Sequence, residues 1–385
     1  MSKKIALWCL AILGISFFVP DILFAQANME DVVNVQKYER SIHILAMLLV
    51  GFGFLMVFVR KYGYSAITAT YLMVSIAIPL YFLIKGWGIM GEVSHSDQIN
   101  TLLFAEFAAA SLLIAIGAPL GRLKMPQYIL AAILFIPAYI LNEWIVLGGA
   151  FGLVHSFMDT AGSITIHAFG AYFGLGMIMS MTTKKEFETE IPSVKTSNQF
   201  SLLGSMVLWM FWPSFCSAMV EPSLVPLTAI NTIIALCGAT IATYLFSRLL
   251  RNGRVEIADM ANAALAGGVA IGATCANITP NYAFLVGIIG GAISVIGYAI
   301  IQPALQKMIK GIDTCGVHNL HGMPGVFGGL IAVLFVSSKG DQVLGIVITV
   351  ALALIAGLIT GQILTVLGRR TDAYDDVEEF ASAEE

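Results

Sequence analysis

Hydrophobic runs about 20 residues long, separated by short polar segments, follow one another along almost the whole chain. A helix needs about 20 predominantly apolar residues to cross the hydrocarbon core of a bilayer. The pattern therefore predicts an all-α polytopic membrane protein with eleven transmembrane helices. The predicted spans lie near 41–59, 64–84, 101–121, 125–145, 162–181, 199–219, 224–247, 258–276, 282–303, 319–337 and 342–367.

Composition and charge agree with a membrane protein and give its orientation. Of the 385 residues, 58% are hydrophobic and 11% are charged, whereas a soluble domain has about 25% charged residues. Fourteen Lys and Arg residues fall on one side of the predicted topology and four on the other. Because Lys and Arg concentrate in cytoplasmic loops, the richer side is predicted to be the inner one. The mature N-terminus is then outside and the C-terminus is cytoplasmic.

The two ends of the chain are expected to lie outside the membrane domain. Lys3 and Lys4 precede a short apolar stretch, and Ala25-Gln-Ala27 fits a small-x-small cleavage pattern. We therefore expect residues 1–27 to be a cleaved signal peptide, the alternative being an additional N-terminal transmembrane helix. Residues 371–385 are acidic and are expected to form a solvated cytoplasmic tail.

One motif occurs twice, at the start of the fifth and of the tenth hydrophobic run. Asp159-Thr-Ala-Gly-Ser-Ile-Thr-Ile-His167 returns as Asp313-Thr-Cys-Gly-Val-His-Asn-Leu-His321, and each copy leads into a glycine-rich apolar segment. Two copies indicate a duplicated half-unit. Since five helices per half is an odd number, the second half enters the membrane inverted, as a five-plus-five inverted repeat. The predicted boundaries are a membrane domain of 28–370, halves of about 41–183 and 198–338, and an eleventh helix of about 342–367.

The two histidines at the ends of these motifs, His167 and His321, occupy equivalent positions in halves that run in opposite directions. The repeat axis can therefore bring both rings to mid-membrane, side by side. Two neutral imidazoles can share one hydrogen bond and present their other nitrogens to a neighbouring space. Such a pair would form a polar strip in an apolar pore that a small polar molecule could use. The alternative is that each histidine is a core residue bonded to a neighbouring helix.

Three other polar residues of these motifs are candidates for a structural or a functional role. Asp159 and Asp313 head their helices, where a carboxylate caps free backbone N–H groups. Asp159 faces the outer side and could also favour a cation in an outer vestibule, whereas Asp313 faces the inner side and is expected to be structural. His318 lies one turn before His321, but the equivalent position in the first copy is Ile164. The sequence therefore leaves open whether His318 lines the path.

We expect no metal or cofactor, no nucleic-acid partner and no catalytic residues. The five cysteines lack CxxC spacing, and the histidines have no cysteine or carboxylate companions at ligand spacing. The cysteines are therefore interpreted as small core residues. No nucleotide-binding motif is present, so transport is expected to be passive. Glu106 is an ionisable residue in an apolar run and needs a polar partner that the sequence does not name.

At these residues the chain resembles the ammonium transporter and Rhesus family, and most closely its Rhesus branch, including the Rhesus-type proteins of ammonia-oxidising bacteria. The resemblance covers about residues 50–370 and rests on the two motifs from Asp159 and Asp313. It implies eleven helices, a homotrimer with one pore per subunit, and a plasma membrane (bacterial inner membrane) location. The site residues that it implies are the twin pore histidines His167 and His321, the outer aspartate Asp159, and the stacked gate phenylalanines Phe107 and Phe215.

The outer mouth departs from the pattern of ammonium transporters. They place a tryptophan twelve residues before the aspartate, where this chain has Leu147, and a serine four residues after the second gate phenylalanine, where it has Met219. A cation–π cage for ammonium needs aromatic faces. Losing one face and the hydroxyl argues against tight capture of the cation, and the Rhesus resemblance likewise implies a lower-affinity, higher-throughput conduit.

The sequence therefore predicts a passive channel that recruits ammonium, removes its proton and conducts ammonia past the twin histidines. Stripping water from an ammonium ion in a low-dielectric site costs several kcal/mol or more, and neutral ammonia loses far less. Whether the proton returns outside or crosses along the histidines stays open. Two alternatives also stay open: a carbon dioxide channel, and a redox subunit with His167 and His321 as axial haem ligands.

Overall fold

The computed structural model describes residues 29–88, 98–368, 370 and 373–381. These residues form helices, turns and loops and contain no β-strand. Helices suit a chain with this hydropathy because a helix satisfies its backbone hydrogen bonds internally and can therefore cross lipid. The predicted signal peptide at 1–27 lies outside the described residues.

The first half of the chain forms long helices that are interrupted near their ends by short irregular turns. These elements are α2 (Met29–Ala46), η1 (Met47–Phe52), α3 (Gly53–Leu55), η2 (Met56–Phe58), α4 (Gly63–Gly86), α5 (Gln98–Gly117), α6 (Met125–Val146), η4 (Ala150–Gly152), η5 (Ser163–Ala168) and α7 (Phe169–Met181). A short helix, α8 (Lys184–Glu188), follows in the connection to the second half. Thr183 and Glu186 form a capping box at its start, which satisfies two free N–H groups.

The second half of the chain forms a more interrupted set of helices. It contains α9 (Lys195–Cys216), η6 (Pro222–Leu224), α10 (Val225–Leu250), α11 (Ile257–Asn262), η7 (Ala263–Leu265), α12 (Ala266–Ile271), α13 (Pro280–Ile296), η8 (Gly297–Ile301), α14 (Gln302–Ile309), η9 (His318–Gly322) and α15 (Met323–Ala332). The last helix, α16 (Lys339–Val366), packs against α7 of the first half.

Within the described residues, eight helices are long and apolar enough to cross a membrane. The three other predicted spans coincide with α9, with α11 to α12, and with η9 to α15. Helix α9 begins with polar residues, and the other two segments are short and mostly buried. Segments that pack inside the protein need less hydrophobic surface than those that face lipid.

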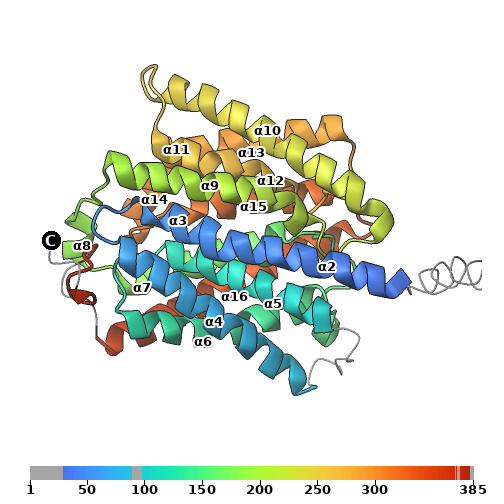
Figure 1. Cartoon of the computed structure of the whole chain (residues 1–385), viewed down its shortest axis with the longest axis horizontal. Coiled ribbons are helices and arrows are strands. Elements are labelled where there is room, and N and C mark those ends of the chain that lie inside the picture. Colours follow the sequence, from blue (N-terminus) through green and yellow to red (C-terminus); the bar gives the residue numbers. More distant parts are fainter. Residues whose placement is uncertain (1–28, 89–97, 369, 371–372, 382–385) are drawn as a thin grey trace, which may run out of the picture.

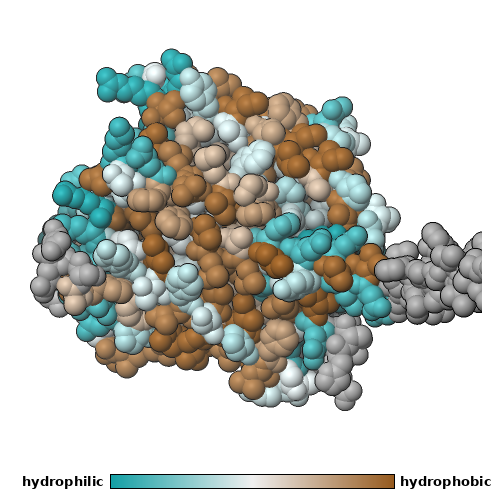
Figure 2. Space-filling view, viewed as in Figure 1, coloured by the Kyte–Doolittle hydropathy of each residue, from teal (hydrophilic) through white to brown (hydrophobic). Residues whose placement is uncertain are grey.

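The long helices run roughly alongside one another, with α10 along one edge of the view and α4 and α6 along the opposite edge (Figure 1). The motif segments η5 and η9 contact each other, and α15 packs against η5 and α12. Hydrophobic residues cover the middle of the face shown in Figure 2, and hydrophilic residues gather toward its ends. An apolar belt of this kind is expected where side chains face lipid rather than water.

The helices α10 and α13 approach closely at glycine. A Cβ added at Gly287 would lie 2.0 Å from the carbonyl oxygen of Ala235, and small residues allow such backbone contact between helices in lipid. We expect Gly287→Ala to lower the free energy of unfolding by about 1–3 kcal/mol, the usual cost of overpacking. Thermal unfolding of the purified protein measures this. Gly340→Ala, where an added Cβ meets nothing within 4 Å, is the control, and equal loss in both variants would contradict the packing role.

The described part of the acidic tail, residues 373–381, packs against the loops at the same end of the molecule. The backbone N–H of Tyr374 donates to Gly121 O at 2.9 Å, and the Tyr374 side chain is buried. The Asp376 carboxylate accepts from the N–H groups of Tyr64 and Ser65 at 2.9 Å and so caps the N-terminus of α4. Tail residues that were expected to be solvated therefore complete a helix end in this part of the chain.

Candidate functional site

The two motif histidines lie in direct contact inside the molecule. His167 Nδ1 and His321 Nδ1 are 3.2 Å apart, and the rings are nearly parallel, with an interplanar angle of 11°. Their exposed fractions are only 3% and 4%. Two nitrogens at this distance share one hydrogen bond if one ring donates and the other accepts, which two neutral imidazoles can do. His167 Nε2 has no hydrogen-bond partner among the described residues.

Both histidines belong to π-helical turns, η5 and η9, at the start of their helices. Such turns are rare and occur often at functional sites, because the wider turn re-aims a side chain. In η5 the turn follows Gly162, whose φ of 75° lies in the left-handed region that glycine tolerates. The Ser111 hydroxyl donates to Ile166 O at 2.7 Å and ties this turn to α5. The same local geometry therefore recurs in both copies of the motif.

Each motif aspartate caps the turn that carries its histidine. The Asp159 carboxylate accepts from the N–H groups of Ile164 and Thr165 and from the Thr165 hydroxyl, the shortest contact being 2.7 Å. The Asp313 carboxylate accepts from the N–H groups of Val317 and His318 at 3.0 and 3.1 Å. Burial raises the pKa of Asp159 to about 6, although these hydrogen bonds oppose the shift. Burial also raises the pKa of Asp313, against its own hydrogen bonds.

Aromatic rings continue the line of the histidines on both sides. Phe107 and Phe215 are in contact, with ring centroids 4.8 Å apart and an interplanar angle of 56°, and both are buried. The Phe215 and His167 centroids are 6.0 Å apart. Trp212 stacks on His167 at 5.6 Å, and Phe52 stacks on His321 at 6.5 Å.

Phe52 was not singled out from the sequence, although the repeat contained a signal for it. Trp212 comes from the first helix of the second half, and Phe52 comes from the first helix of the first half. An aromatic on this helix therefore covers one histidine in each half. The sequence holds 23 phenylalanines, and only this symmetry distinguishes Phe52 from the rest.

A cavity lies beyond the phenylalanine pair, on the side that carries Asp159. Phe107, Leu147 and Asp159 line it together with two acidic residues, Glu143 and Glu221. Leu147 is 45% exposed there. The side chains that predicted an outer vestibule from sequence therefore do border one common space.

Glu143 is the functional candidate at this cavity that sequence reasoning missed. Its carboxylate accepts from the Tyr81 hydroxyl at 2.8 and 3.0 Å and lies 3.7 Å from Lys85 Nζ. The signal was available, because an ionisable residue in an apolar run is a candidate functional residue by default. From the sequence this rule identified only Glu106, whose partner is Ser41: the Ser41 hydroxyl donates to Glu106 Oε1 at 2.6 Å.

A smaller cavity lies on the opposite side of the histidine pair. Phe52, Asn262, Cys315, Leu320 and His321 are among its lining residues. His318 is not among them: its ring meets Tyr172 edge-on at 5.6 Å. The structure therefore places His321 on this cavity and His318 against the neighbouring helix α7.

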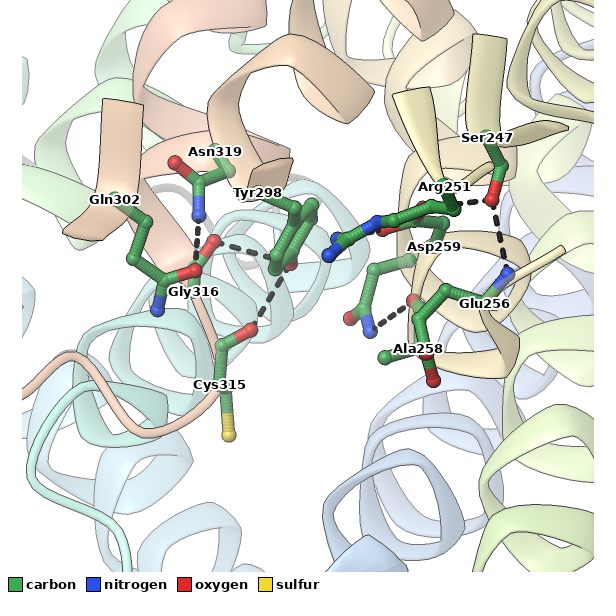
Figure 3. Close-up of polar contacts among 11 residues, drawn as sticks. Ser247, Arg251, Glu256, Ala258, Asp259, Tyr298, Gln302, Cys315, Gly316 and Asn319 are labelled. Atoms are coloured by element: carbon green, nitrogen blue, oxygen red, sulfur yellow. Dashed lines mark hydrogen bonds and ion pairs between the residues drawn. The ribbon is translucent and has the colours of Figure 1, made fainter. Parts of the chain in front are cut away.

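Polar contacts around this smaller cavity fix the loop that carries the second motif (Figure 3). The Tyr298 hydroxyl donates to Cys315 O at 3.0 Å and to Gly316 O at 3.1 Å. Asn319 Nδ2 donates to Gln302 Oε1 at 2.9 Å. Nearby, the Arg251 guanidinium and the Asp259 carboxylate form an ion pair at 3.1 Å. The contacts of Tyr298 and Gln302 hold η9 and the loop before it from η8 and α14, whereas the ion pair joins the end of α10 to α11.

The contact between the two histidines bears on the alternative of axial haem ligation. In the part of the chain that the structure describes, no group of three His, Cys, Asp or Glu side chains could hold a metal ion. The imidazoles of His167 and His321 touch, so no porphyrin can lie between them. The contact between the two imidazoles therefore does not fit the axial haem ligation that the sequence left open.

Comparison with known proteins gives a consistent result. Residues 6–379 match the model of the Ammonium Transporter Family. The chain is 36% identical over 369 residues to ammonium transporter Rh type A of Bos taurus, covering 91% of this chain and 85% of that relative. It is 38% identical to ammonium transporter Rh type B of Oryctolagus cuniculus, covering 80% and 68%.

Solved structures show the same fold. A structure of Nitrosomonas europaea Rh50, from the Rhesus protein family of channels, is 54% identical with a TM-score of 0.89, covering 91% of this chain and 93% of that one. A sensor Amt protein, 21% identical with a TM-score of 0.76, covering 89% and 95%, shares the fold alone. The chain therefore belongs to the ammonium transporter family, and within it to the Rhesus proteins.

Proposed function

We propose that this protein is a passive channel that recruits ammonium at its outer cavity and conducts ammonia across the membrane. The observation that supports this most strongly is the unbroken series Phe107, Phe215, His167 and His321 between two cavities. Such a series offers hydrogen bonds to a small neutral molecule only at the histidines. A hydrated cation would lose most of its solvation there, at a cost of several kcal/mol or more.

Recruitment of the cation is assigned to the outer cavity. Glu143, Asp159 and Glu221 line this space, and carboxylates raise the local concentration of a cation. The proton leaves before the phenylalanine pair, because neither ring can accept it. Ammonia then passes the histidine pair, where the unpartnered His167 Nε2 is available to hydrogen-bond with it, and is reprotonated at the inner side.

The finer architecture belongs to the same proposal. We infer that α9, α11–α12 and η9–α15 also cross the membrane, which gives eleven spans in a five-plus-five inverted repeat. We infer a homotrimer with one pore per subunit, a plasma membrane (bacterial inner membrane) location, an outer N-terminus after signal-peptide removal, and a cytoplasmic tail. The matching caps, π-helical turns and covering aromatics of the two motifs support the repeat.

Stopped-flow measurement of internal pH in proteoliposomes given an ammonium gradient tests the proposal. We expect entering ammonia to raise internal pH faster than in protein-free vesicles. A parallel measurement with a carbon dioxide gradient, which lowers internal pH, tests the main alternative. If only the carbon dioxide gradient gives a faster pH change than protein-free vesicles, the substrate is carbon dioxide and not ammonia. If neither gas gives a faster pH change than protein-free vesicles, the protein is not a channel for small neutral molecules.

Asp159→Asn should retain the fold and lower ammonium-driven flux about tenfold. Asparagine caps a helix about as well as aspartate, but the neutral amide removes the attraction for a cation, which is worth about 4 kcal/mol at about 4 Å near a protein surface and less at larger distances. The same flux assay measures this. Asp313→Asn, which changes the equivalent cap at the other end, is the control: its amide oxygen can keep only one of the two cap hydrogen bonds, and it should still conduct closer to wild type than Asp159→Asn does. Full activity in Asp159→Asn would leave only the capping role.

A further inference from the structure

Helix α2 contacts α5, the helix that carries Phe107, at the residue immediately before Phe107. The hydroxyl of Ser41 donates to Glu106 Oε1 at 2.6 Å, and Phe107 follows Glu106 on α5. Both polar side chains are buried, and Glu106 Oε2 has no hydrogen-bond partner among the described residues. Since a carboxyl group buried in an apolar site needs polar partners, Ser41 fixes where this turn of α5 can lie.

Helix α2 also contacts α9, the helix that carries Phe215, at the residue immediately before Phe215. His43 Nδ1 lies 2.9 Å from Ser214 Oγ, and Phe215 follows Ser214 on α9. The His43 ring also stacks on Phe211, with centroids 4.9 Å apart. Helix α9 carries Pro213 at this point, and proline removes a backbone hydrogen bond and allows a helix to bend. The contact from α2 therefore holds α9 where its own hydrogen bonding is weakest.

We propose that Ser41 and His43 form a brace, the α2 brace, that sets the separation of Phe107 and Phe215 and thereby the size selectivity of the pore. The two rings are in contact at 4.8 Å, so a small displacement of either helix changes the gap between them. Two hydrogen bonds from one helix, each reaching the residue before a gate ring, restrain both displacements at once. The inference rests on the proposed role of the two phenylalanines as a gate.

The chain offers a matched control for the brace. Lys37 Nζ donates to Asn100 Oδ1 at 2.8 Å, which also joins α2 to α5. This pair lies near the start of α5, almost two turns before Phe107. Breaking this hydrogen bond loosens the contact between α2 and α5 at a distance from Phe107.

Full-length variants in proteoliposomes test the brace through the ratio of methylamine flux to ammonia flux, after subtraction of protein-free vesicles. We expect Ser41→Ala, His43→Phe and Ser214→Ala each to raise this ratio about fivefold, the effect of one hydrogen bond of ordinary strength. His43→Phe keeps a ring on Phe211, and His43→Gln, which can still bond Ser214, should restore the wild-type ratio. Lys37→Ala should not change it.

The pairing of His43 with Ser214 gives a second test. Because both single substitutions remove one shared hydrogen bond, the double variant should show the ratio of either single variant rather than their product. If His43→Phe does not fold, Ser214→Ala tests the same bond from α9. Phe107→Ala serves as the reference for an opened gate.

The outcomes separate the brace from the proposed function. If Phe107→Ala raises the ratio while Ser41→Ala and Ser214→Ala stay within twofold of wild type, the gate stands and the brace is wrong. If Lys37→Ala shifts the ratio as much as they do, the effect is general loosening and the brace is again wrong. If wild-type protein carries no ammonia, or Phe107→Ala leaves the ratio unchanged, the gate itself fails and the brace with it.

Discussion

Replacing either His167 or His321 with alanine should lower ammonia conduction about tenfold or more while the protein still folds. The two Nδ1 atoms share one hydrogen bond at 3.2 Å in a buried site. Removal of one ring leaves the other without its partner, which costs about 1–3 kcal/mol for a buried polar group. It also removes one of the few groups that can hydrogen-bond to passing ammonia. Since 1.4 kcal/mol corresponds to a factor of ten, the lost partner alone corresponds to about fivefold to 150-fold, and the loss of a group that bonds ammonia adds to it.

Stopped-flow pH measurements in proteoliposomes, on protein shown to be folded by gel filtration, give the comparison. His318→Ala is the matched control, because His318 lies one turn away on the same segment but packs against Tyr172. We expect it to conduct close to the wild-type rate. Wild-type conduction in both pair variants would show that the histidines do not act on ammonia. If His318→Ala loses as much conduction as His167→Ala and His321→Ala, the loss comes from removing a side chain of η9 in general and not from the histidine pair.

The histidine pair was predictable because a repeat constrains geometry more strongly than any single motif. Equivalent positions in two halves that are predicted to be inverted can meet near the repeat axis, and His167 and His321 do lie in contact. The same reasoning gave no answer for His318, whose counterpart is Ile164, and in the structure its ring meets Tyr172 of α7. Symmetry therefore identified the residues that both halves supply and gave no information on those that one half supplies alone.

Contacts between helices that are distant in the sequence could not be predicted in the same way. Glu106 needed a polar partner, and Ser41 supplies it from a helix 65 positions away. Many serines in the apolar runs were equally plausible donors, because the sequence does not show which acceptor a given hydroxyl will bond. The π-helical turns at both histidines were also hidden, since they depend on how the Asp159 and Asp313 carboxylates bond to the backbone rather than on apolar spacing.

The outer cavity explains why one substitution at Leu147 should change affinity. Leu147 lines this cavity together with Phe107 and Asp159 and is partly exposed. It offers no π face to a cation, whereas a tryptophan at the same position would. Trp144, one turn earlier on α6, packs on Phe151 and does not line the cavity. We infer that the wild-type vestibule attracts a cation through its carboxylates, which act over a distance, while Phe104, Phe107, Tyr139 and Phe157 are the aromatic residues of its lining.

Leu147→Trp should lower the half-saturating ammonium concentration by a few-fold to about thirty-fold and slow maximal flux. One added cation–π contact is worth about 0.5–2 kcal/mol, depending on desolvation, and 1.4 kcal/mol is a factor of ten in affinity. A cation held more tightly also leaves the vestibule more slowly. Concentration-dependent flux of ammonium or methylammonium in liposomes measures both effects, and Leu147→Met, which adds no π face, is the control. Tight saturation in the wild type, or no shift in Leu147→Trp, would show that the missing tryptophan does not set the affinity. Asp159, or the contact between Phe107 and Phe215, would then determine how strongly the cation is held before it loses its proton.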